Sequence, residues 1–500
     1  MKSADVIPSA LFFQAPASKA PPSGRLLLIS FHFPPGGGAG ALRWQKLARF
    51  AGERGQTLDV ITLHPSDLDK IDNKRLADLP RGTRIYGVPM PALLLERIEG
   101  LFWRYLPWLR RRNPAASELW ERAAPLHATE HVKVTRRPSE ALHDRIVQRF
   151  RQVLCAMRRG YFAWMDYYTH GAWANDATTL GLQLLAAEKY DAIITCGPPH
   201  MAHEAGRRLA QRTGLPLVVD LRDPWSMVER LPHVFDSAIW YRLATFYERR
   251  VVARASLIVM NTTRAQDAMQ ALYRSKQSRI VAVMNGYDEE ASCAVHAERK
   301  FIIAYAGAVY LDRDPRVLLK AVARVVSSLE LTPGEIGTEF MGHVESYQGI
   351  SLRSLADAEG IADYVRILGP SPRDAALEFL SRASVLVSLP QDSDMAIPSK
   401  IFEYMQFDAW ILAIAQRGSA TELLLRDSGA NVVAPDDLEG MTEALISRFR
   451  QHRQGTRPAR LAAGMSFASR RAQAALLFDR LDEVVRSGQP GRTASGTEVA

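Results

Sequence analysis

Residues 26–63 read LLLISFHFPPGGGAGALRWQKLARFAGERGQTLDVITL, and they indicate the fold class more clearly than any other segment. The apolar run Leu26–Phe31 predicts a buried strand, and the glycine-rich turn behind it leads into a predicted helix over Ala41–Arg54. Gly55 is placed to end that helix, and Leu58–Leu63 is the next predicted strand. A strand, a turn, a helix and a second strand in this order predict a parallel sheet with a right-handed crossover.

The same alternation returns twice downstream. The first series has predicted strands at Ala192–Thr195, Leu217–Val219, Leu257–Met260 and Ile280–Met284 and a helix at His200–Arg212. The second has predicted strands at Phe301–Tyr305, Val365–Leu368, Val385–Leu389, Trp410–Ala415 and Asn431–Val433, and helices at Pro315–Ser328, Arg373–Arg382 and Ser399–Met405. We therefore predict an α/β fold of two tandem Rossmann-like domains that face each other across a cleft.

The predicted domain boundaries follow the breaks in this alternation. They are a flexible tail at 1–24, a first domain at 25–288, a second domain at 289–466, a helix at 467–487 that crosses back to the first domain, and a flexible tail at 488–500. Residues 90–180 do not alternate and are predicted to be a helical insertion in the first domain. Within the insertion, apolar residues from Leu94 to Tyr105 fall on one helical face with arginines beside them. Such a helix either lies on an anionic membrane or packs on the first domain.

Composition excludes several classes of protein. The 500 residues are 47% hydrophobic and 23% charged, which is typical of globular proteins and excludes disordered and fibrous chains. Three distant cysteines without a CxxC pair disfavour disulfide and cysteine–zinc scaffolds and suit a reducing cytosol. We therefore expect a cytoplasmic protein, peripheral on the inner face of the membrane if the insertion binds lipid. The net charge of +9 indicates an anionic partner, and nucleic acid is disfavoured because the arginines form no known module.

The glycine-rich turn is the first motif with a chemical meaning. Gly37 and Gly38 stand between a strand and a helix, where the backbone can approach an anionic ligand closely. A tight structural turn is the alternative. NAD is disfavoured because Asp59 lies inside the second strand, whereas a ribose-binding acid would stand at its end.

Two further motifs in the first half also follow strands. His200 closes the stretch TCGPPH and could bind a sugar hydroxyl, or it could be a surface histidine at a helix start. In the stretch DLRDPW, Arg222, Asp223 and Trp225 could bind a polar acceptor, or the arginine and an aspartate could close a loop.

The second half carries a set of cations beside turns. Gly307 follows a predicted strand, and Arg313 stands just before the next helix, where it could meet a phosphate or simply be solvated. Ser399 and Lys400 open another helix, whose free N–H groups could hold a diphosphate. Glu403 follows one helical turn later and could accept hydrogen bonds from a ribose.

The stretches PPGGGAGALR, GPPH, DLRDPW, NGYD and IPSKIFEY together resemble the family 4 glycosyltransferases of bacterial surface-polysaccharide synthesis. The resemblance covers residues 26–485, weakly through the insertion. It implies the GT-B fold of two Rossmann-like domains, a nucleotide-sugar donor held mostly by the second domain, and retention of the anomeric configuration. It also implies no obligatory metal and no cofactor.

The resemblance further implies roles for individual residues. Gly37, Gly38 and Gly307 would lie near the donor diphosphate, and Ser399 with the N-terminus of its helix would help to hold it. Arg313 and Lys400 would neutralise the departing diphosphate as catalytic residues, with His200 as a third. Glu403 would hold the ribose, while Arg43, Arg222, Asp223 and Trp225 would meet the acceptor.

Two departures from the family pattern are visible. The basic residue that usually follows the Arg313 position by a few residues is not evident, since Val317 and Leu318 stand there. The family has a pair of glutamates eight residues apart, and Met395 stands where the earlier one is usual. Asp392–Asp394 resembles the metal-binding triplet of the other glycosyltransferase fold. Such a triplet is common by chance and this fold rarely uses it, so a metal there is disfavoured.

We expect a retaining glycosyltransferase of the hexosyltransferase type (EC 2.4), which moves a sugar to a lipid-linked or saccharide acceptor in polysaccharide biosynthesis. Two alternatives remain. One is a sugar-nucleotide epimerase or hydrolase on the same fold, and the other is an inactive homologue that binds a sugar nucleotide or a synthase partner.

Overall fold

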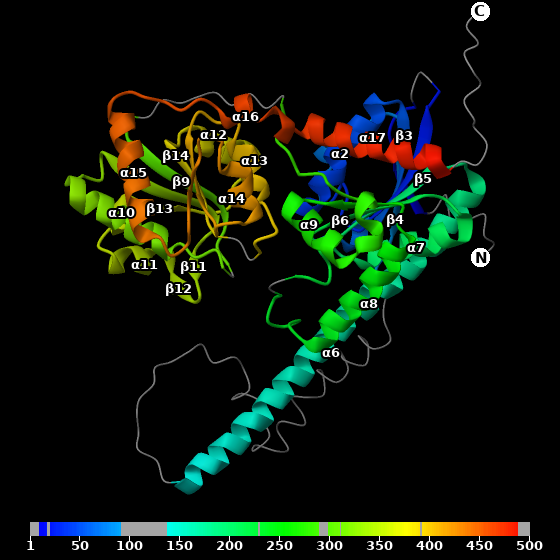
Figure 1. Ribbon diagram of the computed structural model, residues 1–500, viewed down its shortest axis with the longest axis horizontal. Helices are drawn as coiled ribbons and strands as arrows, with labels where there is room; N and C mark the ends of the chain where they lie inside the picture. The colour runs from blue at the N-terminus through cyan, green and yellow to red at the C-terminus, as the bar shows by residue number, and fades with distance from the viewer. Residues whose placement is uncertain are drawn as a thin grey trace, which may run out of the picture. The chain divides into compact units, whose positions relative to one another are not determined.

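A computed structural model describes residues 10–17, 21–91, 138–228, 231–289, 299–310, 312–390 and 393–488 (Figure 1). Two large sheets organise the described residues. One has eight strands in the order β1-β4-β3-β2-β5-β6-β7-β8, and the other has six in the order β13-β10-β9-β14-β15-β16. The expected α/β class and the two mainly parallel sheets are confirmed.

The first sheet contains the two strands of residues 26–63. Its strands are β1 (Leu11–Gln14), β2 (Gly24–Ser30), β3 (Gln56–Leu63), β4 (Arg84–Val88), β5 (Ala192–Cys196), β6 (Leu217–Arg222), β7 (Leu257–Met260) and β8 (Ile280–Ala282). Its helices are α2 (Leu42–Glu53), α3 (Lys74–Ala77), α6 (Pro138–Ala187), α7 (Met201–Thr213), α8 (Ala238–Arg254) and α9 (Thr263–Leu272). Strand β2 lies between β3 and β5 and is parallel to both, so the carboxyl ends of these strands share one edge of the sheet.

The expected flexible tail contains a strand. β1 pairs antiparallel with β4 at the edge of the sheet, with Leu11 opposite Tyr86 and Gln14 opposite Arg84. The alanines, prolines and serines on either side hid this short apolar run. The prediction of a tail is therefore wrong over Leu11–Gln14, because these residues satisfy the hydrogen bonds of an otherwise open edge.

The expected helical insertion is represented by α6. This helix of 50 residues continues to Ala187, beyond the expected end of the insertion at residue 180. Its C-terminal half packs against α7 and α8, while its N-terminal half extends away from them (Figure 1). The predicted amphipathic helix between Leu94 and Tyr105 lies outside the described residues.

The second sheet is parallel throughout. Its strands are β9 (Phe301–Ala308), β10 (Ile336–His343), β13 (Val365–Leu368), β14 (Val385–Ser388), β15 (Trp410–Ile414) and β16 (Asn431–Val433), beside a hairpin of β11 (Ser346–Tyr347) and β12 (Ile350–Ser351). Its helices are α10 (Arg316–Leu329), α11 (Leu352–Ala358), α12 (Arg373–Ser381), α13 (Ser399–Tyr404), α14 (Ala420–Leu425), α15 (Leu438–Arg453) and α16 (Leu461–Gly464).

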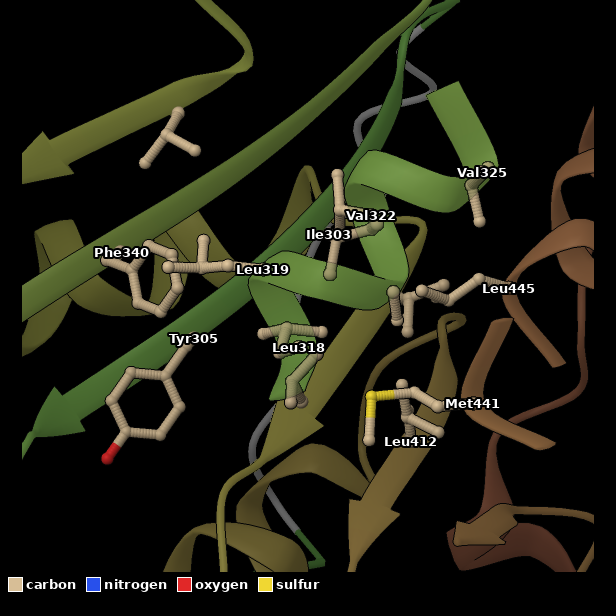
Figure 2. Close-up of a cluster of buried hydrophobic side chains, with 14 of the residues drawn as sticks. Ile303, Tyr305, Leu318, Leu319, Val322, Val325, Phe340, Leu412, Met441 and Leu445 are labelled. Carbon is tan, nitrogen blue, oxygen red and sulfur yellow. The ribbon is translucent and has the colours of Figure 1, made fainter. Parts of the chain in front are cut away.

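Alternating residues of β9 bury themselves on opposite faces of this sheet. Ile303 and Tyr305 join the cluster covered by α10, α11 and α15, whereas Ile302 and Ala304 join the one covered by α12, α13 and α14. Figure 2 shows the first cluster, where the apolar residues of α10 from Leu318 to Val325 lie against Ile303. Burial on both faces explains why the strand is apolar without alternation in its sequence.

The chain divides into two compact units, residues 1–217 with 230–255 and residues 218–229 with 256–500. The division falls beside β6 because the C-terminal helix α17 (Arg470–Gly488) contacts β7 and belongs with it to the second unit. The domain boundaries drawn from the sequence at 288 and 466 stay a prediction. None of the helices in the described part of the chain combines the length and the apolarity that a membrane span requires.

Candidate functional site

An unusual contact between a lysine and a tyrosine lies at the carboxyl end of β9. Lys400 comes from α13, whose residues Ile401 and Phe402 pack on one face of the sheet, whereas Tyr305 packs on the other face. Yet the Nζ atom of Lys400 lies 3.9 Å from the centre of the Tyr305 ring. The lysine side chain therefore crosses the end of the sheet to reach this ring.

Gly307 makes this crossing feasible. A Cβ atom at Gly307 would lie 2.6 Å from Nζ of Lys400 and 3.2 Å from the hydroxyl of Tyr305. The backbone of Gly307 has φ of +151°, which side chains rarely adopt. Gly342 pairs with it in the next strand, and a Cβ there would lie only 2.1 Å from the Gly307 carbonyl oxygen. Both glycines are needed for the close approach of these backbones and of the ammonium group.

Lys400 is an electrostatically costly residue in the free protein. Within the described residues its buried Nζ has no hydrogen-bond partner. Burial, reinforced by the cation of Arg313 and opposed by Glu403, lowers the pKa of Lys400 to about 7. A buried ammonium without a partner is destabilising, and an arriving anion would relieve that cost.

Arg313 is held beside this ammonium by a turn. Its backbone N–H donates to the carbonyl of Tyr310, and its guanidinium carbon lies 4.3 Å from the centre of the Tyr310 ring. Burial raises the pKa of Tyr305 to about 12, although the Arg313 cation opposes this effect. Tyr305 is therefore neutral at physiological pH, and its hydroxyl donates to the Ala308 carbonyl at 2.7 Å. The structure thus brings Arg313, Lys400 and Gly307 together.

Ser399 and Glu403 lie on the same short helix as Lys400. Ser399 is exposed at the first position of α13, where backbone N–H groups have no partner within the helix. Glu403 forms an ion pair with Arg373 of α12 at 2.8 Å. The arginine is largely exposed, so a ligand could displace it at small cost.

A polar cavity of about 450 Å³ lies at the carboxyl ends of β14 and β15. Asp314, just before α10, and Arg316, its first residue, form one wall, and Ser388, Gln416 and Ser419 contribute to the rest. Neither Lys400 nor Arg313 lines it. Its hydroxyl and amide groups suit a polyhydroxylated ligand better than a phosphate.

The glycine loop of the first sheet is held from behind by one arginine. The guanidinium of Arg75 donates to the carbonyl oxygens of Gly36 (3.0 Å), Gly37 (3.0 Å) and Gly38 (3.1 Å). The N–H of Gly37 donates to the carbonyl of Lys70 at 2.9 Å, so this amide is already used inside the protein. Sequence reasoning missed Arg75 because a short helix outside the main alternation supplies it.

His200 lies at the N-terminal boundary of α7 and packs against a second histidine. The rings of His200 and His203 are 5.6 Å apart, and a Cβ at Gly197 would lie within 2.7 Å of both side chains. His203 is fully buried, which lowers its pKa to about 3, and its Nδ1 lies 2.8 Å from the Thr195 hydroxyl. His203 is thus a neutral support for the loop, and only His200 reaches the surface.

Two of the four predicted acceptor residues are buried, and the other two are partly exposed. Trp225 and Arg43 are 1% and 3% exposed, so their side chains offer almost no surface to an acceptor. Arg222 and Asp223 are partly exposed, and Arg222 adopts φ of +67° at the end of β6. The first two residues therefore fit a structural role, whereas the strained turn at Arg222 keeps two polar side chains accessible.

Asp59 has a structural partner set that explains its place inside β3. Its carboxylate accepts hydrogen bonds from Arg25, Arg84 and the hydroxyl of Tyr190, and it is completely buried. Within the described residues, no group of three or more histidines, cysteines and acidic residues could hold a metal ion, and Asp392 lies outside them.

Comparisons with known proteins agree with this picture. Residues 110–286 match the model of the glycosyl transferase 4-like domain family. D-inositol 3-phosphate glycosyltransferase of Nocardia farcinica is 28% identical over 241 residues, and the protein of that name from Thermobifida fusca is 26% identical over 247. These matches cover 44% of this chain and 52% and 54% of the relatives, so the chain spans about half the length of the curated relatives it matches.

Solved structures share the fold across nearly the whole chain. HepE of Anabaena, solved in complex with UDP and glucose, superposes with a TM-score of 0.54 at 11% identity and covers 92% of this chain and 100% of that one. Sucrose-phosphate synthase of Thermosynechococcus elongatus gives 0.54 at 13% identity and covers 93% and 100%. Residues 110–286 are therefore similar to the glycosyl transferase 4-like domain, and the chain shares the two-sheet fold of these solved structures.

Proposed function

We propose that the protein is a retaining glycosyltransferase of the hexosyltransferase type, which moves a sugar from a nucleotide-sugar donor to a lipid-linked or saccharide acceptor in cell-surface polysaccharide biosynthesis. The observation that carries the proposal is the buried ammonium of Lys400, which lies beside the Arg313 cation and has no hydrogen-bond partner among the described residues. The nucleotide sugars named with the neighbouring structures carry the diphosphate that such a pair of cations would attract.

The reaction breaks the bond between the anomeric carbon and the diphosphate oxygen and forms one between that carbon and an acceptor oxygen. Negative charge grows on the diphosphate as it leaves. Cations that are already in place stabilise this charge without reorganising at the moment of reaction. Lys400 and Arg313 supply the positive charge, and Gly307 leaves room for the phosphate oxygens to approach the lysine.

The rest of the donor would be held by α13 and its surroundings. The first N–H groups of this helix, at Ser399 and Lys400, would donate to phosphate oxygens. Glu403 would exchange its exposed partner Arg373 for ribose hydroxyls. In the first sheet, Gly38 remains the glycine that could face a phosphate, since the Gly37 amide is occupied.

Three residues are proposed to meet the acceptor, and Arg43 and Trp225 are not among them because both are buried. His200 would take up or return the acceptor proton, and Arg222 with Asp223 would bind acceptor hydroxyls. An enzyme with a lipid-linked acceptor works at a membrane surface. We therefore propose a cytoplasmic protein in peripheral contact with the inner face of the cell membrane.

The experiment is a screen of nucleotide sugars by thermal shift and calorimetry, because a ligand that binds only the folded protein raises its melting temperature. Transfer is then measured with the donor that binds. Lys400→Met should abolish binding or lower turnover by a factor on the order of 10²–10³. Lys320→Met is the matched control, since Lys320 is an exposed lysine of α10. Unchanged turnover in Lys400→Met would remove this residue from the mechanism.

A second candidate function is favoured by Met395, which stands where the family has a glutamate. An inactive homologue would bind the nucleotide sugar or a synthase partner without transferring the sugar. Donor binding that depends on Lys400, together with no turnover and no hydrolysis over a panel of lipid-linked and free saccharide acceptors, would establish this function.

A further inference from the structure

One face of α6 exposes a long stripe of apolar and aromatic side chains. Met157 is 66% exposed and Trp164 is 40% exposed, values more typical of charged surface residues. The stripe consists of Val153, Leu154, Met157, Tyr161, Trp164 and Tyr168. Because successive α-helical residues turn by about 100°, these side chains fall within a sector of about 100°.

Charged residues are sorted around this stripe. By the same helical geometry, Arg149 and Arg158 lie about 80–100° to its two sides, and both side chains are exposed. The guanidinium carbon of Arg158 lies 5.5 Å from the centre of the Phe162 ring. Asp166 lies on the opposite side of the helix, where it pairs with His170 at 3.1 Å. The stripe is therefore bordered by positive charge on both sides and has its acidic residue behind it.

The stripe is held in a fixed orientation by α8, which packs on α6 beside one edge of the stripe. Tyr167 is buried there and stacks on Tyr247 of α8 with ring centres 5.8 Å apart. A Cβ at Gly160 would lie 2.8 Å from Ile239 of α8, which shows how closely the two helices approach. The aromatic rings of the stripe also order one another, since Trp164 and Tyr168 stack at 5.2 Å with an angle of 13° between them.

We infer that this stripe is a docking surface for an anionic phospholipid bilayer. A helix that lies in the membrane interface places aliphatic and aromatic side chains below the headgroups and basic side chains among them. Arginines on both borders suit this arrangement, because each can extend to lipid phosphates while the stripe is inserted. An interface between two copies of the chain would instead place the four arginines of two stripes close to one another without acidic partners in the stripe.

This inference deepens the peripheral contact of the proposed function and assigns it to α6, distinct from the helix expected between Leu94 and Tyr105. It rests on that function only for the biological purpose of the contact. Its test can fail while the transferase proposal stands, because nucleotide-sugar binding is measured separately on the same proteins.

The test is co-sedimentation of the full chain with vesicles of phosphatidylcholine, with and without phosphatidylglycerol. The wild-type protein should bind the anionic vesicles, and added salt should weaken the binding. Met157→Ser with Trp164→Ser should lower the partition coefficient about tenfold or more. Arg149→Gln and Arg158→Gln should each lower it about fivefold.

Leu272→Ser is the matched control, since Leu272 is an exposed apolar residue at the end of α9. This variant should bind vesicles as the wild type does. All variants should stay folded with only a small change in melting temperature, because every changed side chain lies on the exposed surface. Equal binding by the stripe variant and the control, or no binding by the wild type at low salt, would overturn the inference. So would a concentration-dependent dimer that the stripe variant disperses, because the stripe would then be an interface between copies.

Discussion

The ammonium nitrogen of Lys400 lies 3.9 Å from the centre of the Tyr305 ring and reaches it across a glycine. The aromatic face stabilises this charge at close range in place of a hydrogen bond, and it stabilises a cation less well than water does. A bound anion would therefore stabilise this ammonium group.

Lys400→Met should stabilise the free protein by about 1–3 kcal/mol at neutral pH, because it removes a buried donor without a hydrogen-bond partner. The lysine has a folded-state pKa of about 7, below its ordinary value of 10.5, so the unfolded chain binds more protons between these values. The contribution of Lys400 to stability therefore improves as the pH rises from 7 toward 10.5. Urea unfolding across this range should show the advantage of Lys400→Met shrinking.

The control for this prediction is Lys320→Met, which should unfold like the wild type over the whole range. With the donor present the order reverses, since the wild type gains stability from binding and Lys400→Met does not. A free Lys400→Met protein that is less stable than the wild type at pH 7 would mean that the lysine supports the fold.

Gly307→Ala should mainly weaken donor binding, whereas Gly342→Ala should mainly destabilise the fold. The new methyl at Gly307 meets the end of a flexible lysine, so the ammonium moves and donor affinity should fall about tenfold or more, with a loss of stability that comes from the strained backbone. At Gly342 the methyl meets a backbone oxygen at 2.1 Å, so β9 and β10 cannot keep their spacing. Chemical denaturation should show the greater loss for Gly342→Ala, and equal losses in the two variants would contradict this account.

Asp59→Asn should destabilise the protein by about 3–5 kcal/mol, because it leaves the cations of Arg25 and Arg84 beside a neutral group. Glu53→Gln is the comparison, as it removes an exposed ion pair with Arg49 and should change stability by about 0–1 kcal/mol. Urea melts of both variants measure the difference. A small effect at Asp59 would show that the buried pairs are replaceable.

Arg75→Gln should loosen the glycine loop, because one guanidinium serves three successive carbonyl oxygens there. Hydrogen exchange at residues 36–41 should become faster, while exchange in β2 and β3 stays as in the wild type. Arg75→Lys should rescue little, because an ammonium lacks the planar fork that reaches several acceptors. Unchanged exchange in Arg75→Gln would show that the loop is ordered by its own turns.

Much of the fold could be predicted from apolar runs and turn residues. The strands at Leu257–Met260, Val365–Leu368 and Asn431–Val433 match the predicted ends residue for residue, and α2 and α10 begin and end within one residue of the predictions. These elements are bounded by turn residues or by breaks in polarity, which local sequence records. β10 was missed because a threonine and a glutamate interrupt its apolar run, although both are buried in the sheet.

The site was predictable only in part. Gly307 stood out because it follows a predicted strand, and Lys400 because it opens a helix, but their contact depends on a crossing between the two faces of a sheet, which no local pattern shows. Burial also could not be read at Trp225 or Arg43, because an aromatic or basic residue beside a turn has the same sequence signature whether it is buried or exposed. The role of Arg75 depends on three backbone carbonyl groups, and the positions of such groups cannot be predicted from side-chain types.

The contact of Lys400 with the diphosphate can be tested by the number of protons taken up when a nucleotide sugar binds. Its diphosphate does not titrate near pH 7, and calorimetry in buffers of different ionisation enthalpy counts the protons. Because the free lysine has a pKa of about 7 and an adjacent anion raises that pKa, the wild type should take up about half a proton at pH 7 and more at higher pH, with falling affinity. Lys320→Met should behave identically. Binding without proton uptake in the wild type, or the same uptake in Lys400→Met, would contradict the claim that Lys400 meets the diphosphate.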